Sequence, residues 1–393
     1  MKNLKTLYQF ELKKILSKKI VWVTVAIMLI LNVFSICGHL MGGYYEIFLR
    51  SKAAEKKLTG RVINQQLLEE TWEAYGKIPA VTTTHYTGTA EYWAYAFHYS
   101  AIFNFVRGTT GMNVDNAMNW EADEEDMYSR RQAMLEDGWN GDYLKEGEKE
   151  YWRQQELSVD KPFEYAYKDG WQTLLNALYT IGFMTLLTIT VCLSNMFPVE
   201  QARRTDQLIL SSRYGKGTLY TAKMLAGISF AAGSSLLYTI TAVALTMAFY
   251  GGAGFGAAIQ FVYPNYSAPL SVGEAVLIGY GLLLVAAILT GVFTMVLSEI
   301  LGNGMGTLAA VSGIIILTMF VDIPDRYRVL AQLWNYLPSE FISIWGIFDR
   351  RLVPFAGTYL TSMQFVPILY IVIGGVLSVT GFKIYKKYQV GAR

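Results

Sequence analysis

Residues 275–298 read AVLIGYGLLLVAAILTGVFTMVLS, a run that contains no charged side chain. A helix needs about 20 apolar residues to cross the hydrocarbon core of a bilayer. Further charge-free runs of sufficient length are Ile20–Tyr45, Trp171–Val199, Met224–Gly273, Ile300–Val321 and Leu352–Phe382. Because a spanning backbone must satisfy its hydrogen bonds internally, these runs predict helices. The sequence therefore predicts an α-helical polytopic membrane protein with six transmembrane helices.

The overall composition agrees with this prediction and excludes several other classes. Of 393 residues, 53% are hydrophobic and only 16% are charged, whereas about 25% are charged in ordinary soluble domains. This excludes a soluble globular enzyme and a disordered chain. Two cysteines are too few for a disulfide-stapled secreted domain. A porin-like barrel is excluded because its strands would alternate in hydrophobicity over short segments.

Charge is distributed unevenly and orients the chain. Residues 41–172 carry 14 Lys and Arg against 22 Asp and Glu, whereas the rest of the chain carries 19 against 9. Three basic segments, 1–19, 197–223 and 383–393, together hold 15 Lys and Arg. Cytoplasmic segments of membrane proteins are enriched in these residues. We therefore predict a multi-pass protein of the cytoplasmic membrane with both termini in the cytoplasm, and no nucleic-acid partner.

Combining the apolar runs with this orientation gives an order of segments. It comprises a cytoplasmic amphipathic helix (1–19), span 1 (20–41), an extracellular domain (42–172), span 2 (173–196), a basic cytoplasmic loop (197–223), span 3 (224–249), an external loop (250–272), span 4 (274–298), a cytoplasmic turn (299–306), span 5 (307–321), an external segment (322–363), span 6 (364–382) and a cytoplasmic tail (383–393).

The first nineteen residues, MKNLKTLYQFELKKILSKK, predict an amphipathic helix. Its apolar stripe is formed by Leu4, Leu7, Tyr8, Leu12, Ile15 and Leu16, with Glu11 as the one polar exception. The lysines occupy the other face. Such a helix can lie in the headgroup layer of an anionic leaflet, with membrane lipid as its partner. The alternative is a plain positively charged anchor, which gives the same orientation.

The external domain is expected to be mainly α-helical, with helices over 44–76 and 119–137. The aromatic stretch 91–106, EYWAYAFHYSAIFNFV, predicts packing in a core or on the membrane surface, with stacking on a ligand as the alternative. The acidic run Glu121–Asp126 lacks the spacing of a calcium loop. It predicts a solvated helical face, with attraction of a cationic peptide or a metal as the alternative, and we predict no metal site.

The usual catalytic motifs are missing from the sequence. There is no P-loop, because the nearest string, YGKGT at 214–218, has Gly217 where Ser or Thr should follow the lysine. No HExxH or GxSxG motif occurs. Proton-coupled transporters require ionisable groups within the membrane, and the spans contain none near their centres. We therefore expect no enzymatic activity and no cofactor on this chain, and any transport to be powered by a partner.

The basic cytoplasmic loop reads NMFPVEQARRTDQLILSSRYGKGTLYTAK over 195–223. Pro198 is suited to the first position of a helix. A short amphipathic helix over Pro198–Leu210 would present both apolar and charged groups to a docking partner. The alternative is that the loop serves only as a topology signal.

This loop resembles the permease subunits of type-2 ATP-binding-cassette (ABC) exporters. The shared pattern comprises Phe197, Glu200, Leu208 and Leu210, the small-residue turn Ser211–Arg213, and Lys223. The strings FELKKILSKK before span 1 and LWNYLPSEFI at Leu333–Ile342 are also typical of that family. The resemblance covers about two-thirds of the chain, and the large domain between spans 1 and 2 departs from the shortest family members.

The resemblance implies a working unit and a set of site residues. Segment 198–210 would be a coupling helix that docks on a cytoplasmic ABC ATPase dimer, which binds ATP and Mg, and a second permease subunit would complete the assembly. The coupling residues would be Phe197, Glu200, Arg203, Arg204 and Asp206. Residues 4–16 would form an elbow helix, with Leu4, Leu7, Phe10, Leu12 and Ile15 on it. Residues 330–360 would form short re-entrant helices. Asn32, Asn176 and Phe183 are the expected residues of a substrate path.

These expectations lead to two functional hypotheses. The first is the permease subunit of an ATP-driven exporter of an amphipathic substrate, such as an antimicrobial peptide, a lipid or a drug. The acidic and aromatic external domain favours a cationic peptide and hence a role in peptide resistance. The alternative is a membrane-anchored sensor or scaffold with an extracellular ligand-binding domain that signals to a kinase.

Overall fold

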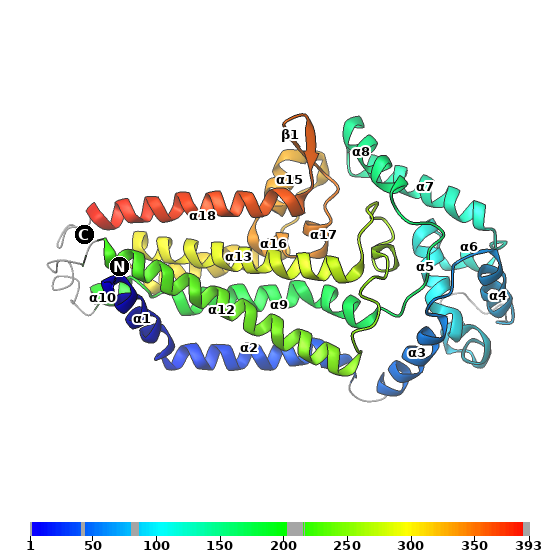
Figure 1. Ribbon diagram of the computed structural model, residues 1–393, viewed down its shortest axis with the longest axis horizontal. Coiled ribbons are helices and arrows are strands. Elements are labelled where there is room, and N and C mark those ends of the chain that lie inside the picture. Colours follow the sequence, from blue (N-terminus) through cyan, green and yellow to red (C-terminus); the bar gives the residue numbers. More distant parts are fainter. Residues whose placement is uncertain (1, 41–43, 80–85, 203–214, 216, 388–393) are drawn as a thin grey trace.

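The computed structural model describes residues 2–40, 44–79, 86–202, 215 and 217–387. Five helices in this part are long and apolar enough to cross a membrane. They are α2 (Lys19–Cys37), α9 (Asp169–Leu193), α12 (Thr218–Phe249), α13 (Val272–Leu301) and α18 (Ser362–Lys387). They lie side by side along the long axis of the molecule, as Figure 1 shows. This is the architecture of an α-helical polytopic membrane protein.

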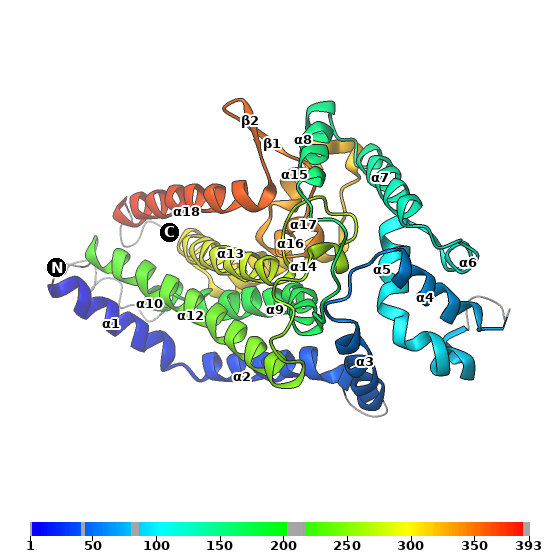
Figure 2. The same ribbon diagram turned by 45° about the vertical axis from the view of Figure 1, so that its right-hand side comes forward.

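The two ends of this bundle differ. Helix α1 (Lys2–Leu16), the short helix α10 (Pro198–Ala202) and the end of α18 lie at one end, the basal end (Figures 1 and 2). The polar segment that was expected to form an external domain lies at the opposite, distal end. The polar segment thus lies at the opposite end of the bundle from α1 and from the C-terminal end of α18.

A sixth apolar helix, α14 (Gly304–Phe320), is shorter than the other five. Its 17 residues correspond to about 26 Å at 1.5 Å per residue. It begins three residues before the predicted span 5 because the chain turns within two residues. Gly302 ends α13 with a positive φ of 59°, and Asn303 accepts hydrogen bonds from the backbone N–H groups of Met305 and Gly306.

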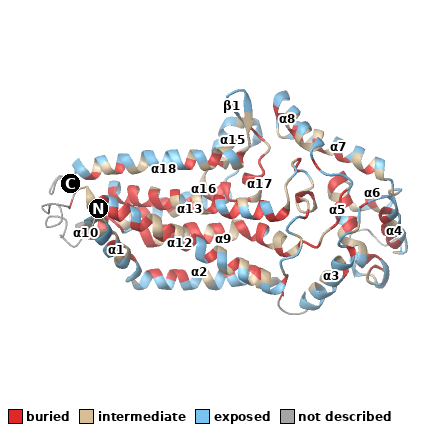
Figure 3. Ribbon diagram, viewed as in Figure 1, coloured by how far each residue is buried: buried red, intermediate tan, exposed pale blue. Residues whose placement is uncertain are grey.

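The core of the bundle is built around α9 and α13. Figure 3 shows buried residues along both helices, whereas α2 and α18 have long exposed faces. The exposed residues on α2 and α18 are themselves apolar, for example Trp22, Ile27, Ile371 and Val376. An apolar face that points away from the protein is suited to lipid. Glycines permit close helix contact, since a Cβ at Gly279 of α13 would meet Leu178 of α9 at 2.6 Å.

The polar segment is mainly α-helical, as predicted. Its helices are α3 (Tyr44–Leu58), α4 (Gln65–Gly76), α5 (Ser100–Thr110), α6 (Val114–Met118), α7 (Glu124–Gly141) and α8 (Glu146–Leu157), with short turns η2 (Tyr86–Gly88), η3 (Tyr92–Ala96) and η4 (Phe97–Tyr99). The prediction of one helix over 44–76 is wrong. Gly60, with a φ of 84°, breaks it, and the Asn64 side chain caps a new helix by accepting from the Leu67 N–H.

The aromatic stretch 91–106 packs into the interior of this polar segment. Tyr92, Phe97 and Phe103 are buried, and the ring of Phe103 stacks on that of Tyr75 with centroids 3.9 Å apart. The core-packing interpretation is therefore confirmed for these three residues.

The acidic run spans the start of α7, which begins at Glu124 and not at residue 119 as predicted, so that Glu121 and Asp123 precede the helix. The side chain of Asp123 caps this helix by accepting from the backbone N–H groups of Glu125 and Asp126. Asp126 also pairs with Arg130 at 2.5 Å, whereas the side chains of Glu121 and Glu125 are exposed. These contacts agree with the predicted solvated helical face.

Between α14 and α18 the chain forms short elements at the distal end of the bundle. They are η6 (Asp325–Tyr327), α15 (Arg328–Asn335), α16 (Pro338–Phe341), α17 (Ile344–Ile347) and an antiparallel hairpin of β1 (Val353–Phe355) and β2 (Thr358–Leu360). Short helices agree with the expectation for 330–360. The hairpin was not predicted, and its turn places Ala356 and Gly357 at positive φ.

This short-element segment is bonded to helix α8 of the polar segment. The buried carboxylate of Glu148 accepts from the guanidinium of Arg328 and, at 2.8 Å, from the backbone N–H of Leu352. The indole N–H of Trp152 donates to the carbonyl oxygen of Arg350 at 2.7 Å. Two segments that are about 200 residues apart in sequence are thus joined around one buried glutamate.

Candidate functional site

A cluster of charged side chains lies at the basal end of the bundle, where three separate segments meet. Its members, the basal cluster, are Glu11 and Lys14 of α1, Glu200 of α10 and Lys223 of α12. One oxygen, the Oε1 of Glu200, lies 2.8 Å from the Nζ of Lys14 and 2.7 Å from the Nζ of Lys223. The Nζ of Lys14 also lies 3.2 Å from Glu11. One glutamate therefore joins the first helix to the helix that follows the basic loop.

Helix geometry explains why these groups meet. Glu11 and Lys14 are three residues apart, so they are neighbours on one face of α1. That face packs against α12, where the Tyr8 hydroxyl donates to the Ser229 hydroxyl at 3.0 Å. Glu200 reaches them because only the four turn residues 194–197 separate the end of α9 from Pro198, where α10 begins.

The basal cluster is largely withdrawn from solvent. The side chain of Lys223 has no exposed surface, and those of Glu11 and Glu200 are 3% and 10% exposed. Burial of an ammonium group is costly unless it is paired and hydrogen-bonded. At Lys14, outside the spanning helices, burial acts to lower the pKa, but hydrogen bonds to Glu200 and Glu11 outweigh it and raise the pKa. The pairing therefore keeps Lys14 charged at neutral pH.

Aromatic rings surround the buried lysine and extend the contact to α18. The Nζ of Lys223 lies 4.8 Å from the ring centroid of Phe197, within the range of a cation–π interaction. The Phe197 ring is buried and contacts Tyr220 of α12 and Tyr385 of α18, with centroids 5.8 Å and 5.7 Å away. The Tyr385 hydroxyl donates to the carbonyl oxygen of Gly215 at 3.3 Å. Phe197 is thus held between two long helices.

The predicted coupling residues are only partly described. Phe197 and Glu200 lie together in the basal cluster and the rings beside it. Arg203, Arg204 and Asp206 lie outside the described residues, as does most of the predicted helix Pro198–Leu210. Sequence reasoning named Lys223 only as part of the family pattern and not as a coupling residue, and it left Glu11 and Lys14 out of the site. The available signal was Glu11, the one acidic residue within an otherwise apolar stripe.

The predicted elbow residues do not share one environment. Ile15 is buried, and Leu4, Leu7 and Leu12 are half-buried, whereas Phe10 is 64% exposed. The face with the four aliphatic residues is directed toward the protein, and Phe10 is directed away from it. Phe10 therefore belongs to a different face of α1 from the other four predicted residues.

The residues predicted for a substrate path also separate. Asn32 of α2 is buried, and its Nδ2 donates to the carbonyl oxygen of Tyr238 of α12 at 3.0 Å, while the Tyr238 hydroxyl lies 2.9 Å from that of Thr188 of α9. Asn32 therefore takes part in packing of three helices. Asn176 is exposed and Phe183 is half-buried, both on α9. The structure does not bring these three residues together.

Comparisons of the chain with models of known protein families, with curated proteins and with solved structures gave no match.

Proposed function

We propose that the chain is the transmembrane permease subunit of an ATP-driven ABC exporter. It would bind a cytoplasmic ABC ATPase dimer that holds ATP and Mg, and pair with a second permease subunit, identical or homologous. The transported molecule would be amphipathic: a peptide such as an antimicrobial peptide, a lipid or a drug. The chain itself would supply no catalytic residue.

The proposal assigns the basal end to the cytoplasm. Lys5, Lys13, Lys14 and Lys19 lie on or beside α1, and Lys383, Lys386 and Lys387 end α18, all at the basal end. Such an accumulation of basic residues supports a cytoplasmic location. In this orientation the polar segment and its helices α3–α8 are extracellular. Helix α14 would then be the sixth span. Helix α13 ends at the basal end and α18 begins at the distal end, so the chain between them has to cross the membrane once.

The observation that carries the proposal is the position of Glu200 between two lysines from different helices. A partner that displaces the segment after Pro198 would pull on Glu200, and through its ion pairs on α1 and α12. A nucleotide on the partner can shift the permease only if it stabilises one of two arrangements more than the other. The basal cluster gives such a displacement a direct physical connection to the bundle.

The experiment compares two neighbouring lysines of α1. Lys14 pairs with Glu200, whereas Lys13 is exposed and bears the same charge. The tagged full chain is isolated from its native membranes, and the ABC ATPase bound to it is identified by mass spectrometry and assayed for ATP hydrolysis. We expect Lys14→Ala to retain the ATPase but to reduce substrate-stimulated hydrolysis at least about fivefold, the lower end of allosteric coupling. Lys13→Ala should hydrolyse ATP at the wild-type rate.

Two results would overturn the proposal. One is a tagged chain that carries no ATPase, which would favour the membrane-anchored sensor or scaffold. The other is equal ATP hydrolysis in Lys14→Ala and Lys13→Ala, which would show that the basal cluster does not couple the ATPase to the helices of the bundle.

A further inference from the structure

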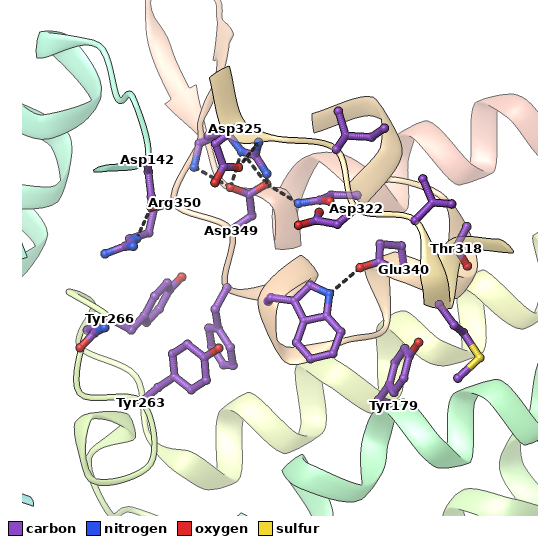
Figure 4. A pocket seen from close by; sticks show the side chains of 18 of the residues that line it. Asp142, Tyr179, Tyr263, Tyr266, Thr318, Asp322, Asp325, Glu340, Asp349 and Arg350 are labelled. Atoms are coloured by element: carbon purple, nitrogen blue, oxygen red, sulfur yellow. Dashed lines mark hydrogen bonds and ion pairs between the residues drawn. The ribbon is translucent and has the colours of Figure 1, made fainter. Parts of the chain in front are cut away.

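A cavity of about 600 Å³ lies at the distal end of the bundle, between the short elements before α18 and the outer turn of α14. Figure 4 shows the side chains that line it, with acidic groups on one side and tyrosines opposite. The walls come from five separate parts of the sequence, including Asp142 of the polar segment, Tyr179 of α9 and Tyr263 of the loop after α12. Cavities of this size hold small organic ligands in other proteins.

The cavity has an excess of negative charge. Its walls contain five carboxylates, from Asp142, Asp322, Asp325, Glu340 and Asp349, and two guanidinium groups. Both guanidinium groups are already paired: Arg350 lies 2.6 Å from Asp142, and Arg351 lies 2.8 Å from Asp349 and 3.2 Å from Asp325. In the described part of the chain no cation pairs with Asp322 or Glu340. Their charges remain available to a ligand.

Besides the excess of negative charge in the cavity, the environment of Glu340 independently indicates a ligand. Glu340 is only 9% exposed, and its Oε1 accepts a hydrogen bond from the indole N–H of Trp345 at 2.5 Å. Its Oε2 has no hydrogen-bond partner among the described residues. Burial raises the pKa of Glu340, the Trp345 hydrogen bond opposes this, and the charge of Asp322 adds to the rise. A bound cation would relieve this unfavourable electrostatic environment.

Aromatic rings stand beside this carboxylate. The ring of Tyr179 lies 5.4 Å from that of Trp345, and the ring of Tyr263 stacks on that of Phe348 at 5.0 Å, between centroids. Ring faces attract ammonium groups, and their apolar surface also takes up the hydrocarbon attached to such a group. Carboxylates next to aromatic rings therefore match a ligand that combines a positive charge with an apolar body.

We infer that this cavity binds an amphipathic organic cation, with the ammonium group between Asp322 and Glu340 and the apolar part against Tyr179 and Trp345. That this cation is also the exported substrate rests on the proposed function. In that case the cavity shows that the substrate is positively charged. Binding itself needs neither ATP nor a partner chain. The ammonium group could be carried by a soluble molecule or by the headgroup of phosphatidylethanolamine, which share this chemistry.

The test measures equilibrium binding of radiolabelled hexylammonium to the purified full chain in a neutral maltoside detergent, with hexanol as the uncharged probe of equal chain length. We expect saturable binding of hexylammonium and none of hexanol. Asp322→Asn should weaken hexylammonium binding about fivefold, as expected for the loss of one exposed charge pair, and Glu340→Gln, at a buried carboxylate, should weaken it at least as much. Glu121→Gln removes an exposed carboxylate from the polar segment and should leave the affinity unchanged.

The outcomes separate cleanly. Equal binding of hexylammonium and hexanol, or wild-type affinity in both Asp322→Asn and Glu340→Gln, overturns the site. Displacement of hexylammonium by dihexanoyl phosphatidylethanolamine identifies a lipid headgroup as the occupant, and resistance to it identifies a soluble cation; both support the cation site. Because no ATPase is present, failure of this assay leaves the proposed function untouched, and failure of the ATPase assay leaves the cation site standing.

Discussion

Glu200 and Lys223 form an ion pair, 2.7 Å between Oε1 and Nζ, in which the lysine side chain has no exposed surface. Lys14 shares the same carboxylate oxygen at 2.8 Å. A buried ammonium group depends on its carboxylate, so the structure around it is expected to be sensitive to the loss of either partner.

Glu200→Ala should destabilise the protein by about 3–5 kcal/mol, because it leaves the buried Lys223 without its carboxylate. Lys223→Met removes the charge together with its need for a partner. The double variant should therefore be more stable than Glu200→Ala alone. Thermal melting of the three variants in detergent measures this, and additive losses in the double variant would contradict the pairing.

Arg131 and Arg130 are neighbours on α7 with very different surroundings. Arg131 is buried, donates two hydrogen bonds to Glu156 at 2.9 Å and 3.0 Å, and donates a third to the carbonyl oxygen of Pro264 at 2.6 Å. Arg130 is exposed and pairs with Asp126. Arg131→Lys keeps the charge but loses the planar fork.

We expect Arg131→Lys to cost about 1.5–3 kcal/mol, the value of a hydrogen bond to a charged group. Arg130→Lys should cost at most about 0.5 kcal/mol, as for exposed pairs on a helix. Limited proteolysis of the polar segment gives the readout, and equal cleavage rates in the two variants would count against the assignment.

The ion pair between Arg131 and Glu156 also predicts how stability depends on pH. Burial acts to raise the pKa of Glu156, but hydrogen bonds and charge from Arg131 and Lys161 outweigh it and hold the pKa below its ordinary value of 4.5. A carboxylate whose pKa is lower in the folded state stabilises the fold above the unfolded pKa. That stabilisation is lost as the pH falls below 4.5 and through the folded-state value.

Melting temperatures of the wild type and of Glu156→Gln, followed from neutral pH to below pH 4.5, test this dependence. The wild type should lose more stability than the variant on acidification, because the variant has no proton to take up at this position. Parallel curves for the two proteins would refute the role of Glu156.

Gly254 and Gly256 offer a matched test of the loop between α12 and α13. Gly254 has a φ of 80°, and a Cβ there would collide with the carbonyl oxygen of Tyr167, at the entry to α9. A Cβ at Gly256 would meet no other atom within 4 Å. Gly254→Ala should destabilise the protein by more than about 1 kcal/mol, because an L-residue is strained there and the backbone cannot yield.

Gly256→Ala should be neutral or slightly stabilising, since it only restricts the unfolded chain. Both variants are compared by thermal melting in the same detergent. If Gly256→Ala were the more damaging of the two, the described path of this loop would be incorrect.

Local signals in the sequence were sufficient for much of the fold. The long charge-free runs correspond to α2, α9, α12, α13 and α18. The start of α13 is readable from Ser271 and Glu274, whose side chains each accept from the other residue's backbone N–H in the structure. Such reciprocal caps depend on residues three positions apart, so a sequence shows them directly.

Contacts between distant segments could not be predicted in the same way. Lys14 and Glu200 are 186 residues apart, and helical periodicity shows which face is buried but not which helix covers it. The cavity at the distal end likewise combines Asp142, Tyr179 and Glu340 from different elements. The break at Gly60 was missed because apolar spacing continued across it, while the cap at Asn64 started a second helix.

The bonds around Glu148 have a consequence for the order in which the protein is made. Arg328, which pairs with it, is translated 180 residues later. At about 5–20 residues per second, this is a delay of roughly 10–35 s. During this interval α8 exists without the partners that bury its glutamate. The contacts around Glu148 can therefore form only after Arg328 and Leu352 have been synthesised, and truncation shortly before residue 328 should leave the polar segment without them.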